Sequence, residues 1–234
     1  MTDDPAEERA ERADVSEHHP SPEPLRYLVR EPSGGTPSPR IVVILHGHGD
    51  DPAPLVDRAG ALARDDVVLV APVGPVRTAD GGPAWFASVD GDVPGRPGEA
   101  GSLAEAIHRL SATVDQVRTT RDEPVERIAG YSQGAATALA LGFGASDDPG
   151  RWRPGTVATL AGWLPSDPDV MWDFAGAAGH TRAVLIHGAD DEVVDAQMGR
   201  SAARVLERSG VEVTFTEVSA GHALTDDGIL RLLG

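Results

Sequence analysis

Short, uninterrupted apolar runs alternate along this chain with segments whose apolar residues recur at helical spacing. Residues 41–45 and 67–70 are apolar throughout, and each run lies near a proline, Pro39 before the first and Pro72 after the second. Runs of this length that are rich in β-branched residues are typical of strands buried on both faces of a parallel sheet. Further strands are predicted at 25–30, as an edge strand, and at 127–131, 156–160, 183–187 and 211–218.

Helical periodicity is clearest in residues 101–118, where apolar side chains recur at steps of three and four. Gly210 follows another helical segment and is suited to a left-handed C-terminal cap. Strands that alternate with helices predict one α/β domain over residues 25–234, in which a mostly parallel central sheet carries helices on both faces. The other helices are predicted at 54–64, 135–143, 195–208 and 226–233.

Residues 1–24 differ in composition from the rest of the chain. They hold eight acidic residues, two arginines and four prolines, with almost no large apolar side chains. Such a segment buries too little surface to offset its ordering entropy, so a disordered acidic tail is predicted. The pair His18–His19 within it is interpreted as solvated rather than as a metal site.

The overall charge excludes some classes of function. The chain has 20 basic and 37 acidic residues, a net charge of −17, and it contains neither lysine nor cysteine. No basic surface is available to neutralise phosphates, which argues against nucleic-acid binding. Without cysteine there is no disulfide, thiolate metal site or cysteine nucleophile. No apolar run is long enough for a membrane span, and no secretory signal precedes the domain, so a cytoplasmic protein is predicted. The acid excess together with the missing lysines indicates a halophilic source.

The segment Gly130-Tyr-Ser132-Gln-Gly134 fits the nucleophile-elbow pattern of hydrolases. A predicted strand precedes it and a helix rich in small residues follows it. A sharp strand-to-helix turn between two glycines would raise the Ser132 hydroxyl above the end of the sheet. The backbone N–H of Gln133 would then lie at a helix N-terminus and face developing negative charge, as one donor of an oxyanion hole.

A serine nucleophile requires a base, and the base requires an orienting acid. His222 follows the last predicted strand, and two candidate acids, Asp190 and Asp191, follow the strand before it. The carboxyl ends of parallel strands meet at one edge of a sheet, so these residues are expected near Ser132. The order serine, aspartate, histidine is that of the α/β-hydrolases.

The turn after the first buried strand contains two histidines, His46 and His48. An α/β-hydrolase places a glycine-bearing turn here, so the backbone N–H of His48 is predicted as the second oxyanion donor. An alternative interpretation is a metal cluster formed by His46, His48 and Asp50, with His187 as a further ligand. The turn is explained without metal, and no metal or cofactor is expected.

Three aromatic residues are predicted to contact substrate: Trp85 and Phe86 in the long connection 75–100, and Trp163 in the connection 161–182. Long loops in a compact domain are usually functional or disordered. Aromatic residues outside a core favour ligand contact over local packing. The second connection spans only about 20 residues, so no large lid is expected.

Five motifs together give the chain a family resemblance. The segments 45–50, 84–86, 130–134, 187–194 and 221–222 resemble, in this order, the phospholipase/carboxylesterase family of α/β-hydrolases, which includes bacterial carboxylesterases and acyl-protein thioesterases. The resemblance covers roughly residues 25–234. It implies a triad of Ser132, Asp191 and His222, with Asp191 preferred to Asp190. It also implies an oxyanion hole of the His48 and Gln133 amides. Trp85 matches a family tryptophan near the substrate.

The resemblance implies a serine hydrolase that cleaves carboxylic esters through an acyl-enzyme, with thioesters and lysophospholipids as further substrates. Three departures from the family pattern exist: His48 replaces a residue that is usually small or aliphatic, Glu192 replaces a common proline, and the final helix, 226–233, is short. The first matters little because the oxyanion hole uses the backbone, whereas the other two concern substrate fit and stability. A small-molecule ester is the expected partner, and a monomer or homodimer is the expected state. Two alternatives remain, a dienelactone-hydrolase-like enzyme, whose usual nucleophile is cysteine, and a non-catalytic binding protein of the same fold.

Overall fold

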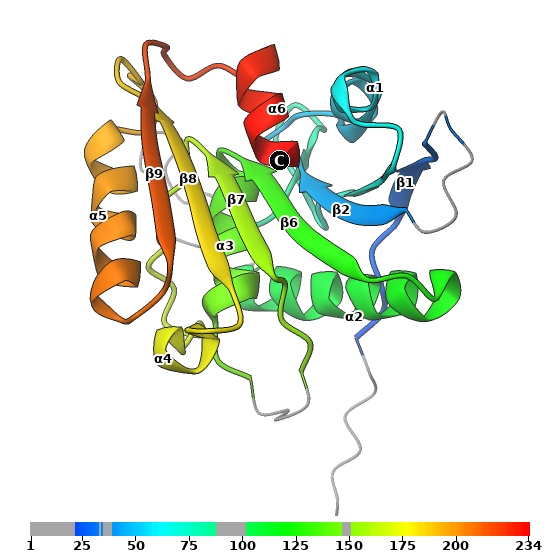
Figure 1. The fold of residues 1–234 in the computed structure, drawn as a ribbon, viewed down its shortest axis with the longest axis horizontal. Helices are drawn as coiled ribbons and strands as arrows, with labels where there is room; N and C mark the ends of the chain where they lie inside the picture. Colours follow the sequence, from blue (N-terminus) through cyan, green and yellow to red (C-terminus); the bar gives the residue numbers. More distant parts are fainter. Residues whose placement is uncertain (1–21, 33, 35–38, 88–101, 147–150) are drawn as a thin grey trace, which may run out of the picture.

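One mostly parallel sheet runs through the middle of the protein (Figure 1). The computed structural model describes residues 22–32, 34, 39–87, 102–146 and 151–234. In these ranges seven strands pair in the order β1-β3-β2-β6-β7-β8-β9, and all neighbours are parallel except β1 and β3. The predicted parallel sheet is therefore confirmed. The strands are β1 (Tyr27–Arg30), β2 (Arg40–Leu45), β3 (Val67–Pro72), β6 (Val125–Tyr131), β7 (Thr156–Leu160), β8 (Arg182–Gly188) and β9 (Val213–Val218).

Helices cover both faces of the sheet, as predicted. Alternate residues of β2 belong to two separate apolar clusters, with Val43 in one and Ile44 in the other. The Val43 cluster is shared with α2, α3 and α5, whereas the Ile44 cluster is shared with α1 and α6. Strand side chains point alternately to opposite faces, so an unbroken apolar run supplies both clusters. The helices are α1 (Pro52–Leu62), α2 (Leu103–Arg121), α3 (Gln133–Phe143), α4 (Phe174–Ala177), α5 (Ala196–Arg208) and α6 (Asp226–Leu233).

Several element boundaries differ from the sequence prediction. β1 begins at Tyr27 rather than at residue 25, because Leu25 is buried and its N–H donates to Thr113 Oγ1. Asp195 lies outside α5 and caps it, accepting a hydrogen bond from Gln197 N at 2.8 Å. The two-residue strands β4 (Val76–Arg77) and β5 (Pro83–Ala84) were not predicted, because a strand of two residues has no readable periodicity.

The predicted acidic tail lies mostly outside the described residues, which begin at residue 22. Within the described end of that segment, the Glu23 carbonyl accepts a hydrogen bond from Arg109 Nε on α2. Residues 88–100 of the first long connection, and residue 101 after it, are also outside the described ranges. Among the described helices, none is long and apolar enough to cross a membrane.

The turn from β6 into α3 passes close to the end of β2. A Cβ atom on Gly130 would lie 2.3 Å from Gly134 O, and one on Gly134 would lie 2.4 Å from His46 O. Both neighbours are backbone atoms, which cannot move aside as a flexible side chain can. Only glycine therefore allows this contact between β6, α3 and β2.

His46, directly after β2, is fully buried beneath this turn. A carbonyl oxygen only accepts, so His46 Nδ1 donates to Gly47 O at 2.7 Å, while Nε2 accepts from Gly74 N at 3.0 Å. The ring also stacks on Trp85, with 4.9 Å between centroids. Burial lowers the pKa of His46 from 6.5, more than the Gly47 hydrogen bond and the nearby carboxylates raise it. The neutral ring therefore joins the end of β2 to the segment after β3.

We expect Gly134→Ala to lower the free energy of unfolding by about 1–3 kcal/mol, the usual cost of overpacking. Alanine ordinarily stabilises a helix relative to glycine, so the sign distinguishes this clash from helix propensity. Gly155→Ala is the control, because its Cβ would meet Glu126 O at an ordinary 3.5 Å. Urea denaturation of both variants measures the difference, and equal stability of the two would contradict the contact.

We expect His46 to make stability depend on pH. Its pKa is lower in the folded than in the unfolded state, so its contribution is complete above pH 6.5. The contribution is lost as the pH falls below 6.5 and through the folded-state pKa, because the unfolded chain then binds the extra proton. Urea denaturation from about pH 7.5 to about pH 5 should show a shallower loss of stability for His46→Gln than for the parent. Parallel curves would contradict the assignment.

Candidate active site

Ser132 occupies the sharp turn between β6 and α3. Its backbone has φ 55° and ψ −120°, a conformation that non-glycine residues rarely adopt. The backbone N–H of Ser132 donates to Leu160 O on β7 at 2.9 Å, which holds the turn against the neighbouring strand. Ser132 is the N-cap residue of α3, yet its hydroxyl makes no capping hydrogen bond. The hydroxyl is therefore free for another partner.

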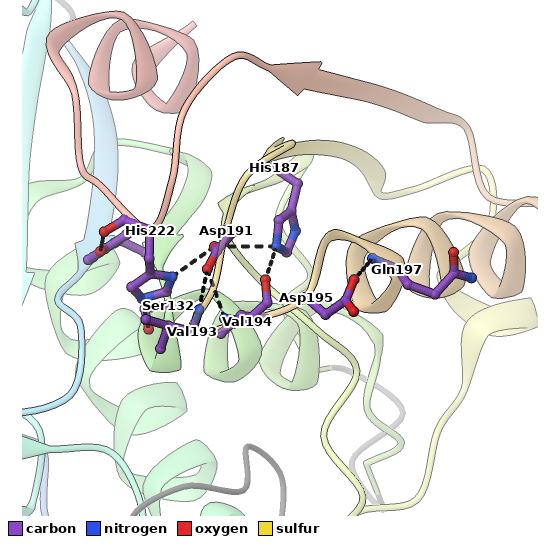
Figure 2. A network of polar contacts seen from close by, with 9 residues as sticks. Ser132, His187, Asp191, Val193, Val194, Asp195, Gln197 and His222 are labelled. Atoms are coloured by element: carbon purple, nitrogen blue, oxygen red, sulfur yellow. Dashed lines mark hydrogen bonds and ion pairs between the residues drawn. The ribbon is translucent and has the colours of Figure 1, made fainter.

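The predicted triad residues meet at the carboxyl ends of three strands. His222 Nε2 lies 3.0 Å from Ser132 Oγ, and His222 Nδ1 lies 2.8 Å from Asp191 Oδ2 (Figure 2). Because the Asp191 carboxylate accepts, Nδ1 carries the donated proton and Nε2 is available to accept from the serine hydroxyl. The geometry is that of a nucleophile, a base and an orienting acid in sequence.

The structure places Asp191, and not its neighbour Asp190, against the histidine. The Asp191 side chain is buried, whereas Asp190 is exposed. Asp191 Oδ1 accepts hydrogen bonds from Val193 N at 2.9 Å and Val194 N at 2.8 Å, leaving Oδ2 for His222. The carboxylate is therefore held on both oxygens by the turn that follows β8.

The predicted oxyanion turn packs directly on the serine turn. Gly134 lies against the carbonyl of His46, as described above, and the indole N–H of Trp85 donates to the same carbonyl at 2.8 Å. Among the described residues, neither the His48 nor the Gln133 amide donates a hydrogen bond to another backbone group. Both amides are thus available as donors, and their role in an oxyanion hole stays a prediction.

The Gln133 side chain has a function that the sequence did not reveal. Its Oε1 accepts from Trp85 N at 2.8 Å, and its Nε2 donates to Phe86 O at 2.9 Å. One amide group therefore pairs with two consecutive residues of the 75–100 connection, almost as a neighbouring strand would. The side chain of Gln133 therefore ties residues 85–86 to the start of α3, where the backbone N–H of the same residue lies.

The expectation that the three candidate substrate aromatics stand outside the core is wrong. Trp85, Phe86 and Trp163 are 0%, 2% and 4% exposed and belong to the same apolar cluster as β2 and α3. Long loops are usually exposed, but Trp85 and Phe86 are drawn inward by the Gln133 hydrogen bonds and by the stacking of Trp85 on His46. Trp85 therefore shapes the turn after β2. Contact of these three residues with substrate stays a prediction.

The connection 161–182 also differs from the predicted ligand-contacting loop. Trp172 and Phe174 stack with ring centroids 5.2 Å apart, and Phe174 lies 6.4 Å from the Phe143 ring. Phe143 is the last residue of α3, at the opposite end of the helix from Ser132. These rings therefore support the far end of α3 and do not form a lid over the triad.

Tyr131 is a further residue of the site that the motif did not single out. Its ring centroid lies 5.2 Å from that of His222, and its hydroxyl donates to the His222 carbonyl at 3.3 Å. Burial, followed by the charges of Asp50 and Asp191, raises the pKa of Tyr131 to about 12. The phenol thus stays protonated near neutral pH and connects the serine turn to the histidine loop.

The alternative metal cluster is contradicted by the hydrogen bonds of its histidines. Both ring nitrogens of His46 already pair with backbone groups, and His187 Nε2 pairs with Val194 O. In the described part of the chain, no group of three histidine, cysteine, aspartate or glutamate residues could hold a metal ion. The histidine-rich turn after β2 is thus built around backbone contacts.

Comparisons with known proteins find similar carboxylesterases and a similar acyl-protein thioesterase. Carboxylesterase SOBER1 of Arabidopsis thaliana is 29% identical over 206 residues, which cover 80% of this chain and 84% of the plant protein. The crystal structure of Zea mays acyl-protein thioesterase 2 superimposes with a TM-score of 0.66 at 25% identity, covering 88% of this chain and 94% of that one. The Bacillus cereus carboxylesterase has the same fold, with a TM-score of 0.71 at 18% identity over 88% of this chain and 91% of the other.

The family model for phospholipase/carboxylesterase matches residues 31–232, nearly the whole of the domain described above. The predicted α/β-hydrolase fold is therefore confirmed, and so is the resemblance that five short motifs carried. The chain belongs to the phospholipase/carboxylesterase family and is an esterase-type hydrolase.

Proposed function

We propose that the chain is a serine hydrolase that cleaves carboxylic esters through an acyl-enzyme intermediate formed on Ser132. The single observation that carries this proposal is the unbroken hydrogen-bonded sequence from Ser132 through His222 to Asp191. Membership of an esterase family is consistent with it. A strained serine backbone at a helix N-terminus, with a hydroxyl that pairs with the base and not with the helix, is the arrangement that such chemistry requires.

In the first half-reaction, His222 Nε2 takes the hydroxyl proton as Ser132 Oγ attacks the ester carbonyl. The negative charge that develops on the carbonyl oxygen is stabilised by the His48 and Gln133 amides. The C–O bond to the leaving group then breaks, and His222 returns its proton to the departing alcohol. The acyl group remains on Ser132.

In the second half-reaction, His222 deprotonates a water molecule that attacks the acyl-enzyme. The tetrahedral intermediate uses the same two amides, and collapse returns the proton to Ser132 Oγ as the acid leaves. Asp191 holds the imidazole in the tautomer that presents Nε2 to serine, and its charge stabilises the imidazolium that forms in each half-reaction.

The same attack cleaves an ester or a thioester, because only the leaving group differs. The relatives include a carboxylesterase and an acyl-protein thioesterase, and we extend both substrate classes to this chain as proposals, together with lysophospholipids. The connection between β7 and β8 packs Trp172 and Phe174 on α3 and adds no lid domain there. This favours small-molecule esters with short or medium acyl chains.

The two alternative functions have less support. A dienelactone-hydrolase-like enzyme would use cysteine as its usual nucleophile, and the chain has none. A binding protein of this fold would have no reason to keep the three triad residues in hydrogen-bond contact. The cytoplasmic location and the monomeric or homodimeric state stay predictions.

We expect Ser132→Ala to reduce kcat for p-nitrophenyl butyrate on the order of 10³-fold or more, because the nucleophile is lost. Labelling by a fluorophosphonate probe should disappear in the same variant. Ser201→Ala is the matched control, since that serine lies exposed on α5. If Ser132→Ala kept both activity and labelling, the proposed function would be wrong.

We further propose that the −17 charge is an adaptation to high salt. Repulsion among exposed carboxylates destabilises the folded state and is screened as the ionic strength rises. The thermal midpoint should therefore rise between about 0.05 M and about 2 M KCl. Sucrose of matched osmolality, which does not screen charge, is the control. Equal midpoints at the two salt concentrations would contradict the adaptation.

A further inference from the structure

His187 is a buried histidine beside the triad for which the proposed mechanism has no use. It lies near the carboxyl end of β8, four residues before Asp191, and is 1% exposed. Figure 2 shows its ring on the side of Asp191 opposite to His222. His187 cannot contact a substrate carbonyl at Ser132, because the Asp191 carboxylate and the His222 ring lie between His187 and Ser132.

The hydrogen bond of His187 fixes which edge of its ring faces the acid. Nε2 lies 2.8 Å from the carbonyl oxygen of Val194. A carbonyl oxygen only accepts, so Nε2 carries a hydrogen. The same nitrogen is 3.5 Å from Asp191 Oδ2, the oxygen that pairs with His222. The N–H therefore points at Val194 O, and the nitrogen that carries it lies beside the carboxylate oxygen that orients the base.

The neighbouring helix α5 restricts the movement of the His187 ring. A Cβ atom on Gly199 would lie 2.4 Å from His187 Nδ1, so the ring packs directly on the backbone of α5. The first turn of that helix is fixed in turn by the Asp195 cap on Gln197 N. A side chain held by packing on a rigid element can position its partner accurately.

His187 also closes the turn that holds the carboxylate. Val194 donates its N–H to Asp191 Oδ1 and accepts at its carbonyl from His187 Nε2. The Asp191 side chain is thus joined to β8 by two routes, one through the backbone and one through His187 and Val194. Without the second route the turn is fixed by the backbone alone, which leaves Oδ2 more freedom to shift from the line to His222 Nδ1.

We propose that His187 is a positioning residue that fixes Asp191 Oδ2 for its hydrogen bond with His222. It acts through Asp191 and does not contact the reacting atoms. This inference rests on the proposed function. The 2.8 Å bond to Val194 O, the 3.5 Å approach to Asp191 and the contact with Gly199 carry it together.

The test compares two amide side chains at position 187. In His187→Gln, the terminal amide nitrogen reaches as far as Nε2 and can donate to Val194 O, whereas in His187→Asn it is too short. We expect His187→Asn to lower kcat roughly 10- to 100-fold with KM unchanged, as misplaced catalytic groups do, and His187→Gln to restore most of it. The far-downfield proton resonance of the His222–Asp191 hydrogen bond should shift in the first variant only.

Two controls separate positioning from loss of stability. Val211 is a buried residue of the apolar cluster that α5 shares with Val43, and it lies away from the triad. Val211→Ala should therefore lower the thermal midpoint and leave kcat unchanged. In an Asp191→Ala background, His187→Asn should have no further effect on kcat, because a residue that acts through Asp191 has nothing left to position.

Three results would overturn the inference: full kcat in His187→Asn, a kcat loss in His187→Gln equal to that in His187→Asn, or the same loss with and without Asp191. If His187→Asn does not fold, the Gln variant decides alone, since a folded His187→Gln with a kcat loss above about 10-fold contradicts the role. An active Ser132→Ala variant would instead overturn the proposed function, so the two failures are distinguishable.

Discussion

The contact between the glycines of the β6–α3 turn and the backbone at the end of β2 is the constraint on which the site depends. Gly134 must lie against the His46 carbonyl for α3 to begin where it does, and this places Ser132 in its strained conformation. The same contact brings the turn after β2 beside the helix N-terminus, where two free amides are available. One close approach of backbone therefore positions both the proposed nucleophile and the candidate oxyanion donors.

The strands and helices that form the two apolar clusters could be predicted from the sequence, because their buried positions appear as apolar runs or as apolar residues at helical spacing. Residues 156–160 and 226–233 match β7 and α6 to the residue, and the apolar run of β2 supplies both clusters. The short hairpin of β4 and β5 and the start of β1 show no such pattern in the sequence. The two strands of the hairpin are too short for a readable periodicity. The start of β1 depends on one hydrogen bond, from Leu25 N to Thr113 Oγ1, between residues far apart in sequence.

The residues of the candidate site likewise include some that could be predicted from the sequence and some that could not. Ser132, Asp191 and His222 follow strands, and parallel strands end at one edge, so their meeting could be predicted before any coordinates. The supporting residues could not, because each acts on a partner distant in sequence: Gln133 on Trp85 and Phe86, and Tyr131 on the carbonyl of His222. Loop composition was misleading for Trp85, since a loop rich in glycine and proline gives no sign that a side chain turns inward.

Stability and catalytic alignment use the same bonds around Asp191. A buried carboxylate without partners would cost several kcal/mol, so the fold must supply donors wherever it places one. Here two backbone amides and His222 supply them, with the N–H edge of His187 close by. Each of these donors also fixes the direction in which Oδ2 points. If His222 paired with the exposed Asp190 instead, Asp191 Oδ2 would lose its hydrogen bond while the carboxylate stayed buried, so the fold favours Asp191 as the partner of the histidine.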